Sequence, residues 1–296
     1  MKPIGIITDS HCGISLKQAE ELGILVLPMP FYINETCYYE NVSLTREQFF
    51  TEQAAGSNIT TSQPSPAEVL KMWDEALQEY EQILYMPISS GLSGSYATAC
   101  VLAQDEPYEG RVFVIDHGRV STPLTSYIID TLELIQEGYS AAEIRDILEN
   151  SRKNMIIYIA VETLEYLKKG GRVTPTAAAL ATILNIKPVL KLDVGKLDMF
   201  KKCRGTHKAR RLMIETIKAD LATRFHDFYE NDAYTIVAAS SASPEVTANW
   251  VQEIQEAFPG KDIISGDLSL GICCHIGPGG LGIGCCCKPV RPEKNT

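Results

Sequence analysis

The sequence predicts an α/β fold made of two α/β domains, and three observations support this. In the first half, short apolar runs alternate with amphipathic helical segments, an order typical of a mostly parallel sheet with right-handed crossovers. The second half adds a predicted hairpin, which favours a mixed sheet with helices. The chain has 296 residues and is 45% hydrophobic, which is enough for two cores. We place the domains at 1–153 and 154–296.

Helix-start signals divide the first half into elements. Ser65 precedes Pro66 and is followed by Glu68, which is a capping box with proline at the first helical position. Ser15 caps another helix, and Thr45 with Gln48 fits a capping box at the start of a third. The strands expected in this half are 4–8, 24–27, 83–88 and 112–115, and its remaining helices are 122–137 and 141–150.

The second half contains elements of both kinds, together with one tight turn. Two apolar runs, 189–192 and 197–200, flank Asp193-Val194-Gly195-Lys196 and predict a hairpin. Ser243-Pro244 begins a helix. The other strands expected are 156–161, 234–239, 262–266 and 283–287, and the other helices are the alanine-rich segment 176–184 and the long amphipathic segment 206–225.

Charge and composition exclude several classes of protein. The net charge is −10 and the basic runs are short, which argues against a nucleic-acid partner. No run of 18 apolar residues is present, so we expect no transmembrane helix. The N-terminus leads directly into a predicted strand without a visible signal peptide. We therefore expect a cytoplasmic location.

Nine cysteines raise the question of disulfides or a metal site. An odd number without secretory features argues against a disulfide framework. Cys273-Cys274 and Cys285-Cys286-Cys287 are adjacent rather than spaced as in zinc sites, and neighbours on a strand point to opposite faces. We interpret them as small apolar residues of a buried strand, and we expect no metal.

The most informative segment is Ser89–Tyr96, which has the sequence SSGLSGSY. It follows the predicted strand 83–88 and precedes a helical pattern at 97–103. Such a turn combines backbone amides, hydroxyl groups and the positive end of a helix, which together favour a small anion such as phosphate or carboxylate. An ordinary helix cap with solvated serines is the alternative.

Two further motifs invite catalytic interpretations. Residues 277–282 fit G-x-G-x-x-G formally, but fourteen residues are too few to complete a dinucleotide-binding βαβ unit. Gly91–Ser95 misses the nucleophile-elbow pattern by one position. A serine hydrolase using Ser93, His275 and Asp9 stays open, because all three are expected in loops at strand ends.

Basic residues and one histidine complete the candidates. Arg172 and Arg204 could each pair with an anion. His275 precedes glycines that allow a close approach of the backbone to a ligand. We interpret Lys168, Lys169, Lys201 and Lys202 as solvated surface residues or as partner-docking residues.

Six motifs in order carry a resemblance to a known family. They are Thr8-Asp9-Ser10, Thr61-Ser62-Gln63-Pro64-Ser65, Ser89–Tyr96, Leu167–Arg172, Asn185-Ile186-Lys187-Pro188 and His275–Gly279. Over residues 4–287 the chain resembles the DegV family, whose members are the fatty-acid-binding partners of bacterial fatty acid kinase. His11-Cys12, His117-Gly118 and the cysteine-rich end depart from the family pattern, and none of these departures removes a ligand-contacting motif.

The resemblance implies roles for individual residues. Thr61 and Ser93 would hydrogen-bond the carboxylate of a fatty acid, with Ser62 and Gly94 beside them. His275 and Arg204 would lie close to that head group and matter for its phosphorylation by the kinase. Arg172 would belong, with Lys168 and Lys169, to a basic rim that docks the kinase.

The resemblance also implies a function. The protein would bury a long-chain fatty acid such as palmitate, stearate or oleate and present its carboxylate to a separate kinase. It would need no cofactor and no catalytic machinery of its own, with at most transient contact with a membrane surface. At ~0.8 kcal/mol per CH₂, a chain of about sixteen carbons gains on the order of 10 kcal/mol by leaving water. An acyl- or phosphoryl-transfer enzyme or hydrolase using Ser93, and a carrier of another amphiphilic acid, remain as alternatives.

Overall fold

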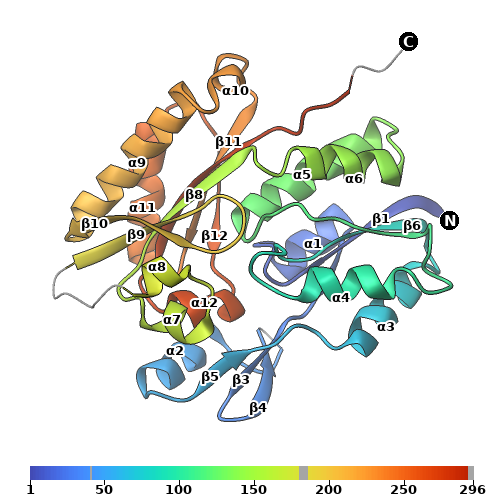
Figure 1. Cartoon of the computed structure of the whole chain (residues 1–296), viewed down its shortest axis with the longest axis horizontal. Coiled ribbons are helices and arrows are strands. Elements are labelled where there is room, and N and C mark those ends of the chain that lie inside the picture. The colour runs from blue at the N-terminus through green and yellow to red at the C-terminus, as the bar shows by residue number, and fades with distance from the viewer. Residues whose placement is uncertain (41, 180–185, 293–296) are drawn as a thin grey trace.

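The computed structural model describes residues 1–40, 42–179 and 186–292. Its first sheet has four strands in the order β2-β1-β6-β7, all parallel (Figure 1). This confirms the parallel sheet predicted for the first half. The strands are β1 (Lys2–Asp9), β2 (Leu25–Leu27), β6 (Tyr80–Met86) and β7 (Val112–Val114).

Helices cover both faces of this sheet. Ile6 and Leu84 pack with Tyr127 and other residues of α5 and α6 on one face. Ile7 and Ile83 pack against Trp73 and other residues of α3 and α4 on the opposite face. Successive side chains of a strand point to opposite faces, so an uninterrupted apolar run is what a two-sided core requires. The helices are α1 (Leu16–Leu22), α3 (Pro66–Ala76), α4 (Ser95–Leu102), α5 (Thr122–Gln136) and α6 (Ala141–Asn150).

The second sheet has six strands in the order β10-β9-β8-β13-β11-β12 and is mixed, as predicted. The β11–β12 pair is parallel and the other pairs are antiparallel. The expected hairpin is β9–β10. One face of the sheet packs on α9 and α11. The elements are β8 (Met155–Ala160), β9 (Ile186–Leu192), β10 (Asp198–Arg204), β11 (Tyr234–Ser240), β12 (Ile263–Asp267), β13 (Leu281–Cys287), α9 (Thr206–Ala222), α10 (His226–Glu230) and α11 (Pro244–Ala257).

A third, three-stranded sheet in the order β4-β3-β5 was not predicted. Its strands have three or four residues each, too few to show an alternating pattern. With α2, it packs against α7 and α12 of the second half, and Phe31 and Phe49 share one apolar core with Leu270 and Cys273 (Figure 1). The elements are β3 (Pro30–Ile33), β4 (Thr36–Tyr39), β5 (Ile59–Thr61), α2 (Arg46–Ala54), α7 (Glu165–Gly170) and α12 (Leu270–Ile276).

Two expectations about local structure need comment. Cys285-Cys286-Cys287 lie in the buried strand β13, as predicted, but Cys273-Cys274 lie in the helix α12. Leu270, Cys273 and Cys274 are spaced as on one buried face of a helix, and Ile276 is also buried. The two adjacent cysteines made this segment resemble a buried strand, so the helical spacing was missed. Of the alanine-rich helix predicted at 176–184, α8 (Pro175–Ala178) is described and 180–184 lie outside the described residues. The domain boundary at residue 153 stays a prediction.

Candidate functional site

A cavity lies where the carboxyl ends of β1 and β6 face the second sheet. It contains about 950 Å³ of space free of protein atoms, its opening to solvent included. Ligands of parallel α/β sheets characteristically bind at this edge. Its apolar wall is formed by Met29, Ile88, Leu92, Val120, Ile157, Ile159, Leu167, Leu192, Leu197, Val237, Ala239, Leu268, Ile272, Ile276 and Ile283.

Polar side chains from distant segments line the same cavity. Thr61 at the end of β5 and His275 in the last turn of α12 are hydrogen-bonded, with 3.0 Å between Oγ1 and Nε2. Ser62, Ser93 and Arg172 also line the cavity. The structure thus brings together four of the predicted carboxylate-site residues, Thr61, Ser62, Ser93 and His275.

His275 is a neutral imidazole in this setting. Burial is the largest cause, and together with the nearby Arg172 and His11 it lowers the pKa of His275 to about 4. Its Nδ1 atom is buried and has no hydrogen-bond partner among the described residues. The glycine at 170 makes room for the ring, because an added Cβ there would lie 1.9 Å from Nδ1. His275 was expected in a loop; it occupies a helix instead, since α12 continues to Ile276.

The serine turn is held by its own hydrogen bonds. The Ser93 Oγ atom lies 2.9 Å from the Ser95 Oγ atom and accepts from the Ser95 amide, at the start of α4. The turn packs on the β9–β10 hairpin so closely that a Cβ on Gly91 would lie 2.2 Å from the Gly195 Cα. Gly94 is exposed and is the N-cap of α4, outside the set of cavity-lining residues.

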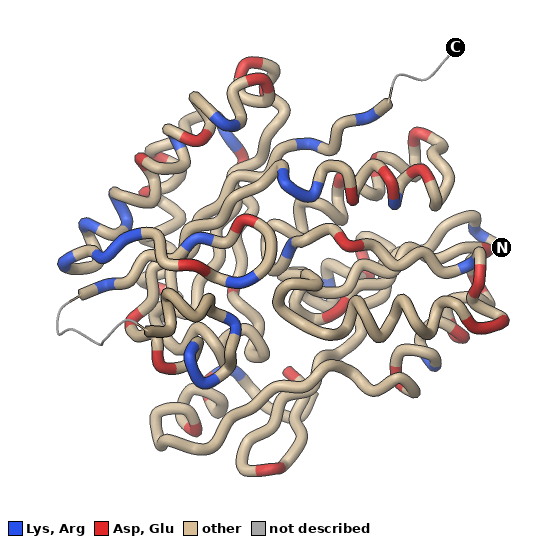
Figure 2. The backbone as a smooth tube through the Cα atoms, viewed as in Figure 1, with Lys and Arg blue, Asp and Glu red and all other residues tan. Residues whose placement is uncertain are grey.

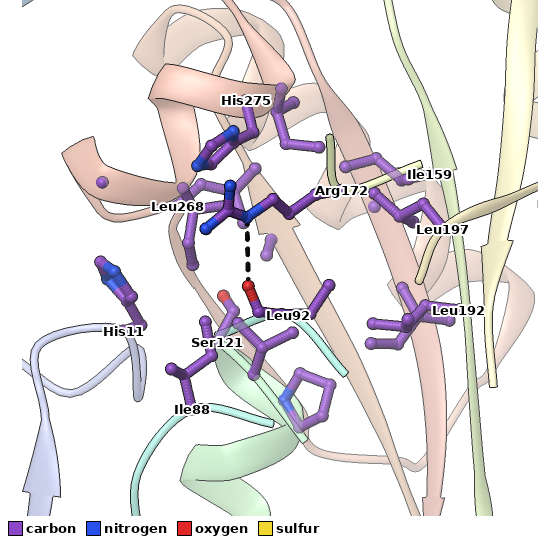
Figure 3. A pocket seen from close by; sticks show the side chains of 18 of the residues that line it. His11, Ile88, Leu92, Ser121, Ile159, Arg172, Leu192, Leu197, Leu268 and His275 are labelled. Atoms are coloured by element: carbon purple, nitrogen blue, oxygen red, sulfur yellow. Dashed lines mark hydrogen bonds between the residues drawn. The ribbon is translucent and has the colours of Figure 1, made fainter. Parts of the chain in front are cut away.

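The two predicted arginines lie in different surroundings. Arg172 Nε donates to the Leu92 carbonyl at 3.1 Å, and its Nη1 donates to the Gly170 carbonyl (Figure 3). It therefore lies in the cavity wall, and its expected place on a partner-docking rim stays a prediction. Arg204 is exposed at the end of β10 and is absent from the cavity lining. Lys168 is half-buried, whereas Lys169 is exposed and donates to Asn58 Oδ1.

Asp9 holds two cavity-lining residues in place through their backbone amides. Its carboxylate accepts from the amides of His11 and Ile88, at 2.9 and 2.7 Å. Both of those residues line the cavity. Burial raises the pKa of Asp9 to about 6, against the two amide hydrogen bonds, which lower it. Asp9 therefore fixes two loops of the site and does not itself face the cavity.

The hydrolase alternative requires an arrangement that differs from the one observed. The Ser93 hydroxyl pairs with Ser95, His275 pairs with Thr61, and Asp9 pairs with backbone amides. A triad instead needs the histidine to bond both the nucleophile and the acid. The three residues do not form a triad.

Three cavity-lining polar residues had no role in the sequence-based assignment. His11 had been noted merely as a departure from the family pattern, and its Nδ1 lies 2.8 Å from Ser269 Oγ. Ser121 and Thr122 line the cavity at the start of α5. Their signal was the Ser-Thr-Pro sequence at a helix start, which by itself predicts a cap rather than a site.

Disulfides, metal sites and membrane-spanning helices are the remaining features that the sequence analysis considered. The nine cysteines are free. Across 1–40, 42–179 and 186–292, no group of three or more His, Cys, Asp or Glu side chains is arranged to hold a metal. Within those ranges, no helix is both long enough and apolar enough to cross a bilayer.

Comparisons with known proteins agree with this architecture. The profile described as "Uncharacterised protein, DegV family" matches residues 3–288. A DegV domain-containing protein of Staphylococcus aureus is 28% identical over 278 residues, covering 94% of this chain and 96% of the relative.

Two solved structures are similar over nearly their whole length. One, described as showing fatty acid binding of a DegV family protein from Thermus thermophilus, has 30% identity and a TM-score of 0.86, covering 96% of this chain and 99% of that one. DegV of Bacillus subtilis, described as a fatty acid binding protein, has 25% identity and a TM-score of 0.78, covering 97% of this chain and 100% of that one. The chain therefore belongs to the DegV family.

Proposed function

We propose that this protein binds one long-chain fatty acid, with its tail in the apolar cavity and its carboxylate at Thr61 and Ser93. The observation that carries the proposal is a cluster of polar side chains with one cation, Arg172, in the wall of a cavity whose lining is mostly apolar. The fatty acid binding described for the Thermus thermophilus relative, at 30% identity, supports the same ligand class.

The chemistry of the cluster suits a carboxylate. A carboxylate accepts up to about four hydrogen bonds, and bonds to an ionised group are roughly twice as strong as neutral ones. Thr61 and Ser93 offer hydroxyl donors, the start of α4 offers a positive helix end, and Arg172 offers a charge. Neutral His275 has a single N–H; with that proton on Nε2 it donates to Thr61 Oγ1 and leaves the Thr61 hydroxyl proton free for the carboxylate. The head group would fix orientation, and tail burial would supply most of the affinity.

We further propose that catalysis belongs to a partner, a cytoplasmic fatty acid kinase that phosphorylates the presented carboxylate. A second hollow, lined by Ser90–Gly94, Arg172 and Lys196, lies on the outer side of the serine turn, where a phosphoryl donor could approach. Basic residues lie on α7, at Lys168 and Lys169, and on β10, at Lys201, Lys202 and Arg204, two stretches coloured blue in Figure 2. On a chain of net charge −10, these basic stretches favour an acidic partner.

The first test is mass spectrometry of lipid extracted from the purified folded protein. We expect one fatty acid per chain, and delipidated protein that takes up palmitate, stearate or oleate. Addition of a fatty acid kinase and ATP should then yield an acyl phosphate, trapped as a hydroxamate. If no lipid is recovered and none of the three acids binds, the proposal fails. Uptake of a lysolipid or isoprenoid acid in preference to all three would point to another amphiphile.

A further inference from the structure

The N-terminus of α5 forms part of the cavity wall and carries two hydroxyl groups. Ser121 and Thr122 line the cavity and are 4% and 1% exposed. Both hydroxyl oxygens are buried, and neither has a hydrogen-bond partner within the described residues. Buried polar groups are rarely left in this state, so each such group calls for an explanation.

The backbone around Ser121 is satisfied, so the unpaired groups are its side chain and that of Thr122. The Ser121 amide donates to the His11 carbonyl at 2.7 Å, and its own carbonyl accepts from Leu124 and Thr125. Ser121 adopts φ 55° and ψ −143°, a conformation that favours glycine. Its hydroxyl makes no cap hydrogen bond to α5. Because the Ser121 hydroxyl stabilises neither the helix nor a neighbouring group, we examine it as a ligand-binding group.

This end of the cavity differs from the carboxylate cluster. Among the described residues, Arg172 is the one Lys or Arg that lines the cavity, and the carbonyls of Leu92 and Gly170 hold it. Ser121 and Ile88 both line the cavity and lie opposite His275 in the view of Figure 3. Two neutral hydroxyls and a helix N-terminus offer hydrogen bonds without a compensating cation. They match a neutral oxygen better than a second carboxylate.

We infer that Ser121 and Thr122 form a second polar site that binds a hydroxyl group carried on the acyl chain, so that the preferred ligands include hydroxy fatty acids. The inference rests on the fatty-acid function proposed above. A site that can hydrogen-bond a ligand hydroxyl discriminates against the analogue that lacks it, because its own buried groups then stay unpaired.

The test compares stearate with its 2-, 10- and 12-hydroxy derivatives, by competition against a fluorescent fatty acid on delipidated full-length protein. At least one hydroxy isomer should bind about five- to tenfold more tightly than stearate, the effect of one net hydrogen bond. The double variant Ser121→Gly, Thr122→Val should lose this preference, so that its affinity for the hydroxy isomers falls at least fivefold more than its affinity for stearate. Glycine suits the backbone at 121, and valine keeps the shape of threonine.

A second buried threonine of α5 provides a control for the loss of a hydroxyl group. Thr131→Val removes a buried hydroxyl of the same helix that bonds the Tyr127 carbonyl and does not line the cavity; it should keep the preference. The inference is overturned if no isomer outbinds stearate, if the preference survives the double variant, or if the double variant weakens stearate and its derivatives equally. That last result would place the carboxylate at Ser121. Failure of stearate itself to bind the wild type would instead count against the proposed function.

Discussion

The Oγ1 atom of Thr61 and the Nε2 atom of His275 lie 3.0 Å apart, although 214 residues separate them in the chain. Thr61 ends a strand of the small third sheet, and His275 lies in the last turn of α12. The hydrogen bond therefore connects the first and second halves of the sequence at the wall of the cavity. A ligand that binds either residue therefore contacts a hydrogen bond that joins the two halves of the chain.

Removal of the carboxylate-binding hydroxyls should weaken fatty-acid binding. We expect Ser93→Ala and Thr61→Val each to raise the Kd for oleate about ten- to a hundredfold, because a hydrogen bond to a charged group contributes about 1.5–3 kcal/mol. Isothermal titration of delipidated protein measures this. Ser90→Ala is the matched control, since Ser90 belongs to the same turn but does not line the cavity. Equal affinities for Ser93→Ala and Ser90→Ala would contradict the assignment.

The space beside His275 depends on a glycine. An alanine at position 170 would place its Cβ 1.9 Å from His275 Nδ1 and 2.6 Å from Cε1. Gly170→Ala should displace the ring, break its bond to Thr61 and lower stability by about 1–3 kcal/mol through overpacking. Urea denaturation and oleate titration check both effects. In Gly266→Ala the nearest atoms would lie 3.4 and 3.6 Å away, and this control should resemble the wild type.

The two arginines can be distinguished by substitution. Arg172→Met should weaken oleate binding at least tenfold and flatten its dependence on salt, because it removes both the charge and the bonds to Leu92 and Gly170. Arg172→Lys should restore little, since lysine lacks the planar set of donors. Arg204→Met, at an exposed position, should leave oleate affinity unchanged. A larger loss with Arg204→Met than with Arg172→Met would reverse our assignment of the carboxylate partner.

The lowered pKa of His275 predicts a pH-dependent stability difference. Histidine titrates near 6.5 when unfolded, and in the folded protein burial, Arg172 and His11 lower the pKa of His275 to about 4. Between these values the unfolded chain binds more protons, so the contribution of His275 to stability falls as the pH falls. Relative to His275→Asn, the wild type should lose up to about 3 kcal/mol of unfolding free energy between pH 7 and pH 4.

Urea titrations of both delipidated proteins at several pH values measure this difference. The comparison between variants is necessary because Asp9, whose pKa is raised to about 6 by burial, adds stability on acidification and opposes the effect in either protein alone. A difference between wild type and His275→Asn that stays constant across this range would show that His275 is not desolvated as described.

Much of the fold follows from local sequence. The capping boxes at Ser15, Thr45 and Ser65 start helices where predicted, because each box satisfies backbone donors within a few residues. Continuous apolar runs became the central strands of the parallel sheet. The motif set also pointed to Thr61, Ser93 and His275, and the structure places all three on one cavity.

The sequence by itself thus determined the α/β class, the order of most elements and the family. Tertiary structure decided which groups meet. It placed Arg172 in the cavity wall, left Arg204 exposed, paired Asp9 with backbone amides, and placed the unpaired hydroxyls of Ser121 and Thr122 at the cavity. Caps and strand patterns depend on neighbours a few residues apart, which a sequence displays. Burial and hydrogen-bond partners depend on segments as distant as β5 and α12, whose approach is decided by packing of the whole chain.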